Sequence, residues 1–134
     1  MKRIIIPESC SNSEIVYPII AYNSDTKTSE VLGKITIDKY NATYTPMIKN
    51  ILIGKCYKKE NGIILLIMLA LWERFGNYIM STDIEIPLGV YKLLSKYNLL
   101  DYNEDGVLFG TSSYSKLKEI VIKLMKKQRW FIWF

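Results

Sequence analysis

The sequence contains no histidine, and this absence removes several kinds of chemistry at once. Without imidazole there is no Ser-His or Cys-His nucleophile pair, no histidine general base and little of the usual ligand set for zinc. The only cysteines, Cys10 and Cys56, are far apart and form no CxxC motif. Because Met1-Lys-Arg3 leads into only three isoleucines, we expect no secretion signal and two reduced thiols, with one disulfide as the alternative. Catalysis without a metal would then depend on carboxylates, tyrosines, lysines, backbone amides or a cofactor.

Long apolar runs are also absent. The longest, Ile63 to Trp72, has ten residues, about half of what a membrane-spanning helix needs. The 134 residues, 49% hydrophobic and 23% charged, match one globular domain over 1–134 with a single buried core. We therefore expect no contact with a membrane.

The net charge of +5 is concentrated in one segment. Residues 116–134 carry six basic side chains and one acidic side chain, whereas residues 1–115 carry 12 of each sign. The basic side chains are Lys116, Lys118, Lys123, Lys126, Lys127 and Arg129. This basic face is a candidate surface for an acidic or phosphate-rich partner, and a solvated helix face is the alternative.

The first sixty residues have the patterns of β structure. Apolar or alternating segments between polar turns predict strands over Lys2–Ile6, Glu14–Asn23, Glu30–Asn41 and Met47–Tyr57. Their short connections favour an antiparallel meander.

The second half alternates helices and strands. It predicts the helix Ile63–Phe75, the strand Asn77–Thr82, the helix Pro87–Tyr97, the hairpin Leu99–Phe109 and a last helix over 114–128. Gly76 should end the first helix, and Ser113 or Ser115 should cap the last. Because the first helix is apolar on every face, it should be packed on both sides. We expect one α/β (α+β) domain with a mixed, largely antiparallel sheet around this central helix.

The turn before the apolar helix has features of an anion site. A helix begins with unpaired amides and a partial positive charge. Gly62 allows a ligand to approach the backbone closely, and Lys58 and Lys59 add positive charge. These features fit a phosphate cradle. A capped core helix with solvated lysines is the alternative.

The order of elements resembles the GNAT family of N-acetyltransferases. In that family the fourth strand splays from the fifth, and acetyl-coenzyme A lies between them with its pyrophosphate on an Arg/Gln-x-x-Gly-x-Gly/Ala motif. Lys59 to Ile64 matches this motif at Gly62, with Lys59 as a charge-conserving substitute and Ile64 in place of a small residue. The resemblance implies acetyl-CoA as cofactor. Its expected pyrophosphate contacts are Lys59 and the backbone amides of Asn61, Gly62, Ile63 and Ile64.

A second landmark of that family is a helix similar to Ala-x-x-Leu-Tyr-x-Lys-x-Gly-Phe, which aligns with Val90–Leu99. The tyrosine that serves many members as general acid falls at Leu94, so the resemblance implies Tyr91 or Tyr97 as the acid. Glu85 would be the base that accepts a proton from an amine, and a solvated loop is the alternative. The two acceptor helices of the family have no counterpart here, because only residues 7–13 separate the first two strands.

A second hypothesis concerns a different class of protein. Met80–Asp83 and the composition rich in Lys, Ile, Asn and Tyr resemble short members of this pattern from phage genomes. The chain would then be a non-catalytic viral accessory or virion protein on the same scaffold. In either case we expect it in the cytoplasm, that of the host if the protein is viral, or in the virion.

The segment Trp130–Phe134 has five consecutive large apolar side chains. Left in water, they would form an unusually large apolar patch, so they should be buried. We expect them either in the protein's own sheet, near the fifth strand as the resemblance favours, or against a second copy or another viral protein.

Overall fold

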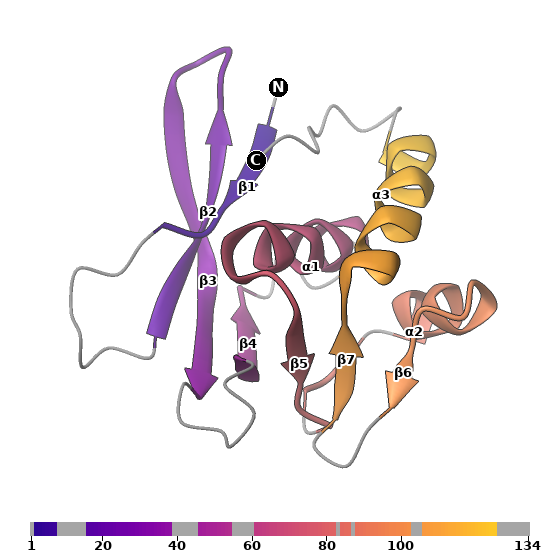
Figure 1. Ribbon diagram of the computed structural model, residues 1–134. Helices are drawn as coiled ribbons and strands as arrows, with labels where there is room; N and C mark the ends of the chain where they lie inside the picture. Colours follow the sequence, from indigo (N-terminus) through magenta and orange to yellow (C-terminus); the bar gives the residue numbers. More distant parts are fainter. Residues whose placement is uncertain are drawn as a thin grey trace.

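Seven strands form one sheet in the order β1-β2-β3-β4-β5-β7-β6 (Figure 1). The structure is a computed structural model that describes residues 2–7, 16–38, 46–54, 61–82, 84–86, 88–102 and 106–125. The strands are β1 (Lys2–Ile5), β2 (Val16–Asn23), β3 (Thr28–Asp38), β4 (Met47–Ile53), β5 (Tyr78–Met80), β6 (Asp101–Tyr102) and β7 (Val107–Phe109). Neighbouring strands are antiparallel except β4 and β5, which are parallel. The predicted mixed, largely antiparallel sheet is confirmed.

Strands β1 to β4 form the predicted meander. Successive residues of a strand point to opposite faces of the sheet, so on β2 and β3 every second side chain faces the core. These buried side chains include Tyr17, Ile19, Ile35 and Ile37. Strand β4 ends at Ile53, earlier than the predicted Tyr57.

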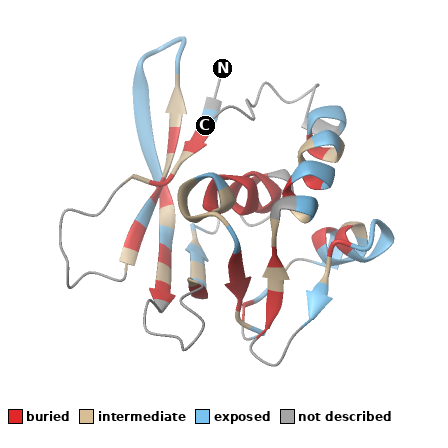
Figure 2. Ribbon diagram, in the orientation of Figure 1, coloured by how far each residue is buried: buried red, intermediate tan, exposed pale blue. Residues whose placement is uncertain are grey.

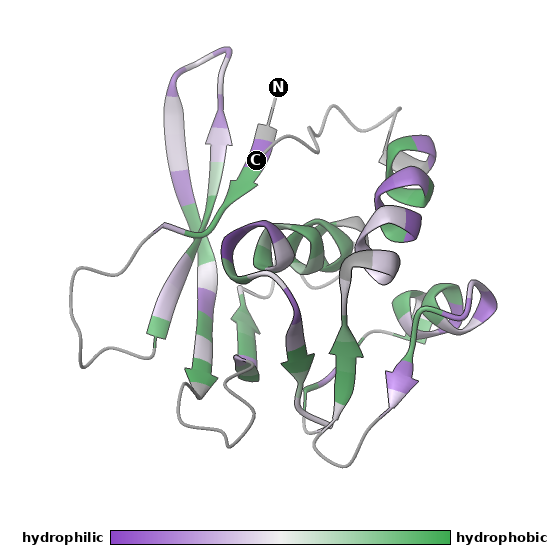
Figure 3. Ribbon diagram, in the orientation of Figure 1, coloured by the Kyte–Doolittle hydropathy of each residue, from purple (hydrophilic) through white to green (hydrophobic). Residues whose placement is uncertain are grey.

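Three helices accompany the sheet: α1 (Asn61–Phe75), α2 (Leu88–Lys96) and α3 (Thr111–Met125). Helix α1 lies across the sheet and contacts α2, α3, β1 and β5 (Figure 1). Every side chain from Ile63 to Leu71 is buried, which confirms the expectation that this helix is packed all round (Figures 2 and 3). Strand β5 is joined to α1 by a buried hydrogen bond, in which the hydroxyl of Tyr78 donates to the Met68 carbonyl at 2.8 Å. Burial also raises the pKa of Tyr78.

The helix ends follow local backbone chemistry. Gly76 ends α1 with φ +72°, and its amide donates to the Trp72 carbonyl, as the sequence predicts. Asn98 takes the same left-handed conformation after α2, with φ 54°. Two boundaries differ from prediction: α1 begins at Asn61 rather than Ile63, and α3 begins at Thr111. Since the Tyr114 amide already donates to the Gly110 carbonyl, the expected caps Ser113 and Ser115 lie inside the first turns of α3.

Strand β5 lies inside the sheet rather than at its edge. Strand β5 pairs with β4 on one side and with β7 on the other, so both of its edges are occupied. A strand directly beside Tyr78–Met80 would therefore find both positions taken, and the expected insertion of Trp130–Phe134 near the fifth strand stays a prediction. Residues 130–134 themselves, like Cys10 and Cys56, lie outside the described residues. Over the described ranges, no helix has the length and apolar character needed to cross a bilayer.

Candidate functional site

The sheet opens between β4 and β5. These strands share only two register pairs, Met47 with Ile79 and Ile48 with Met80. Their outermost hydrogen bonds run from the Ile79 amide to the Pro46 carbonyl, 2.9 Å, and from the Ser81 amide to the Ile48 carbonyl, 3.0 Å. Beyond Ile48, β4 continues for five residues to Ile53 and pairs with β3 without any further pairing to β5. Over Asn50–Ile53, no strand of the described ranges pairs with the β5-facing edge of β4.

A bulge marks the point where the two strands part. The β3–β4 register shifts between Thr36 and Ile37: Thr36 lies opposite Asn50, and Ile37 lies opposite Ile48. Lys49 is therefore the extra residue, and both Lys49 and Asn50 are exposed. A bulge bends its strand and increases the local twist, which turns β4 away from β5.

The amino terminus of α1 lies at the same end of the sheet. Because β4 and β5 are parallel, the connection that contains α1 must return the chain from the carboxyl end of β4 to the amino end of β5. It therefore begins at the carboxyl end of β4, and only residues 55–60 separate Gly54 from Asn61. The amides of Asn61, Gly62 and Ile63 have no carbonyl one turn earlier within the helix. The amide of Ile64 is the fourth of α1, the position that closes the first helical hydrogen bond, as Tyr114 does in α3. The start of α1 thus follows the carboxyl end of β4 in the chain, and α/β proteins commonly bind ligands outside the carboxyl ends of parallel strands.

The predicted cofactor residues divide into three groups. Lys59 lies outside the described residues. Asn61 and Gly62 form the first turn of α1, as an amide cradle requires, and their backbone alone is described. The side chains of Ile63 and Ile64 are buried in the core, so these two residues could offer only amides to a ligand.

The expected base, Glu85, is exposed on the segment between β5 and α2. This segment follows the carboxyl end of β5, and the Ile84 amide donates to the Ser81 carbonyl at 3.2 Å in a tight turn. Glu85 is therefore on the same end of the sheet as the opening. Asp83, two residues before Glu85, lies outside the described residues.

Tyr91 has a partner that the sequence did not indicate. Its hydroxyl is 3.3 Å from the hydroxyl of Tyr102 on β6, and both rings are exposed. The hydrogen bond from Tyr91 is the main cause of a raised pKa at Tyr102, followed by desolvation. The pair joins α2 to the edge strand β6.

Tyr97 lies just past the end of α2, and its ring is under the Nζ of Lys96 at 5.5 Å. Six residues of helical chain turn it about 120° away from Tyr91, so the two expected acids face different directions. Leu94, at the family's acid position, is fully buried. The structure therefore does not bring Glu85, Tyr91 and Tyr97 to one point.

Lys49 and Asn50 are the residues of this region that the sequence analysis overlooked. Two adjacent polar residues interrupt the apolar residues of the segment Met47–Ile53. An extra residue in one strand of a pair is what defines a bulge, and the polar interruption in the sequence falls at that point.

The basic face is described in part. Lys116 and Lys123 are exposed on α3, and the Lys118 Nζ lies 5.4 Å from the centre of the Tyr114 ring. Lys126, Lys127 and Arg129 lie outside the described residues. Among the described side chains, no three cysteine, aspartate or glutamate residues gather in a way that would hold a metal ion.

The chain was compared with protein-family models, curated proteins and solved structures. No protein-family model matches the chain, and neither the curated proteins nor the solved structures gave a match.

Proposed function

We propose that this protein binds acyl-coenzyme A in the opening between β4 and β5. One observation carries the proposal: β4 parts from β5 at a bulge after Ile48, and only residues 55–60 separate Gly54, at the end of β4, from the amino terminus of α1. An extended ligand could hydrogen-bond to the edge of β4 over Asn50–Ile53, where no described strand pairs with it on the β5 side, while an anionic group reaches amides in the first turn of α1. Acyl-coenzyme A has both parts, an amide-containing pantetheine arm and a pyrophosphate.

The electrostatics of the α1 terminus favour the pyrophosphate. Aligned peptide dipoles place about half a positive charge at the start of a helix. The first turn of α1 contains no acidic residue that would oppose an anion. Of the three charged residues directly before Asn61, Lys58 and Lys59 together outweigh Glu60 and would leave one net positive charge. The buried Ile63 and Ile64 hold this turn in place, because their side chains are anchored in the core.

If the bound thioester reacts, the chemistry is transfer of an acetyl group to an amine. The amine nitrogen attacks the thioester carbonyl, and the C–S bond breaks as the C–N bond forms. Glu85 takes the proton that the amine loses, directly or through water. Tyr91 or Tyr97 gives a proton to the leaving thiolate.

A second function, that of a non-catalytic viral accessory or virion protein on this scaffold, is favoured by Leu94. Its side chain is fully buried at the position where the family's acid is expected, and a leucine cannot donate a proton. The separation of Tyr91 from Tyr97 points the same way. Such a protein would act through a partner, with the segment Trp130–Phe134 or the basic face Lys116–Arg129 as contact surface.

Thermal unfolding with and without acetyl-coenzyme A tests the proposal. Ligand at a hundredfold its Kd should add about 2.7 kcal/mol to the free energy of unfolding. For a domain of this size that is a rise of roughly 10 °C in Tm. Pantetheine, which lacks the pyrophosphate, should give a much smaller shift at the same concentration. An unchanged Tm at millimolar acetyl-coenzyme A would contradict coenzyme binding.

A further inference from the structure

Strand β1 leaves one edge of the sheet open. It pairs with β2 through Lys2–Ile5 and stands at the end of the strand order. No other strand of the described ranges pairs with its second edge. In an antiparallel ladder, every second residue of an edge strand points its N–H and C=O away from the sheet. Such a row of unpaired groups is a template for another strand.

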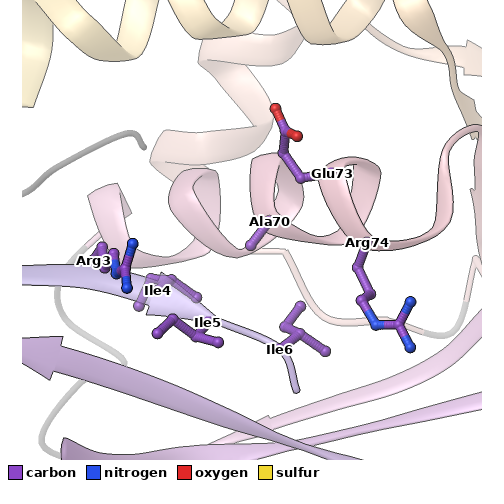
Figure 4. A pocket seen from close by; sticks show the side chains of 7 residues that line it. All are labelled: Arg3, Ile4, Ile5, Ile6, Ala70, Glu73 and Arg74. Atoms are coloured by element: carbon purple, nitrogen blue, oxygen red, sulfur yellow. The ribbon is translucent and has the colours of Figure 1, made fainter. Parts of the chain in front are cut away.

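Helix α1 turns this edge into a groove. A cavity of about 280 Å³ is lined by four consecutive residues of the β1 segment, Arg3 to Ile6, and by Ala70, Glu73 and Arg74 of α1 (Figure 4). The three α1 residues are spaced i, i+3 and i+4 and so share one helix face. Figure 4 shows the carboxylate of Glu73 directed away from β1, and Tyr114 donates a hydrogen bond to it on that side. The wall between strand and helix is therefore mainly apolar, with Arg3 and Arg74 at its two ends.

We propose that the segment Trp130–Phe134 of this same chain occupies the groove as an added strand beside β1. The segment has no charged side chain, and its five large apolar residues match the four residues of β1 in length. A strand in the groove would pair with the open edge of β1 and bury one row of its side chains against Ala70 and the isoleucines of β1. This is strand addition, in which backbone hydrogen bonds give affinity and an apolar wall accepts alternate side chains.

The path of the chain allows this placement. Helix α3 packs on α1, where Tyr114 stacks on Trp72 at 4.1 Å between ring centres. Its carboxyl end and β1 lie on the same side of α1 in Figure 1. Nine residues follow Met125, and an extended chain of that length spans about 30 Å. The basic residues 126–129 then bridge from α3 to the groove, and the uncharged residues enter it.

The groove is separate from the proposed coenzyme site. It lies at the carboxyl-terminal half of α1, whereas the amides without a carbonyl one turn earlier lie at Asn61–Ile63. The rise of 1.5 Å per residue places Arg74 roughly 20 Å from Asn61 along the helix. The added strand therefore does not depend on whether the protein binds acyl-coenzyme A.

Amide hydrogen exchange on the full chain tests the proposal. Ile132→Pro removes a backbone N–H and forbids strand pairing at that residue, whereas Ile132→Val keeps both. In the proline variant the outward amides of β1 should exchange at least tenfold faster, with α1 still protected. The valine variant should exchange like the parent. Equal exchange of β1 in all three proteins would overturn the proposal, and so would β1 protection that disappears on dilution, since that result indicates a second copy.

A proximity measurement covers the case in which Ile132→Pro also unfolds α1. With Trp72→Phe, the only tryptophans are Trp130 and Trp133, and with Cys10 and Cys56 changed to serine a single new thiol can carry a nitroxide. A nitroxide on Arg3→Cys should quench their fluorescence strongly, and the same label on Thr26→Cys, in the exposed β2–β3 turn, should not. Equal or absent quenching from the two positions would overturn the proposal.

Discussion

Leu66→Ala should lower the free energy of unfolding by about 2–5 kcal/mol. The side chain of Leu66 is completely buried in the middle of α1, with the sheet and the other helices around it. Truncation removes apolar contacts and leaves a cavity that a helix packed on both sides cannot close. Urea denaturation with an unchanged m-value would measure the loss. Since domains of this kind are stable by only about 5–15 kcal/mol, the loss is a large share of the total.

Ile122→Ala on α3 is the matched control, because the Ile122 side chain is about half exposed, at 49%. It should cost well under 1 kcal/mol. A similar loss in both variants, or a cost below about 1 kcal/mol for Leu66→Ala, would mean that α1 is not the centre of the core.

Gly62→Glu should abolish binding of acyl-coenzyme A while the protein stays folded. The carboxylate would stand in the first turn of α1, where the helix dipole favours a negative side chain, so the helix itself should not be weakened by the charge. It would, however, occupy the place of the pyrophosphate and repel it. We expect at least a hundredfold weaker binding by calorimetry, with Tm close to that of the parent.

Gly62→Gln has the same bulk without the charge and separates the two effects. It should bind more weakly than the parent but clearly better than Gly62→Glu. If the site is vestigial and the protein acts through a partner, both variants should assemble normally. Loss of assembly by a folded Gly62→Glu protein would instead place the partner at this turn.

The sequence predicted the presence and order of all the described helices and strands, because each has a strong local signal. The apolar residues of α1, the left-handed glycine at Gly76 and the antiparallel pairing of β6 with β7 are examples. Boundaries were less well predicted. Helix α3 starts at Thr111 because the Gly110 carbonyl accepts a hydrogen bond, and the alternative caps at Ser113 and Ser115 differ from it only by small local energies.

The candidate site was only partly predictable, because it depends on contacts between distant segments. The helix start at Asn61–Gly62 was visible in the sequence. The pairing of Tyr91 with Tyr102 was not, since it requires knowing that α2 lies against β6. The complete burial of Leu94 depends in the same way on packing.

Amide chemical shifts during a titration with coenzyme A test the central claim most directly. The account predicts that the largest changes fall on Asn61–Ile64, on the β4 edge at Asn50–Leu52 and on Ser81, the residues around the opening between β4 and β5. Residues of the β1 groove and of the basic face should change little. Changes confined to Lys116 and Lys123, or to the β1 groove, with the amides of Asn61–Ile64 unmoved, would contradict the account.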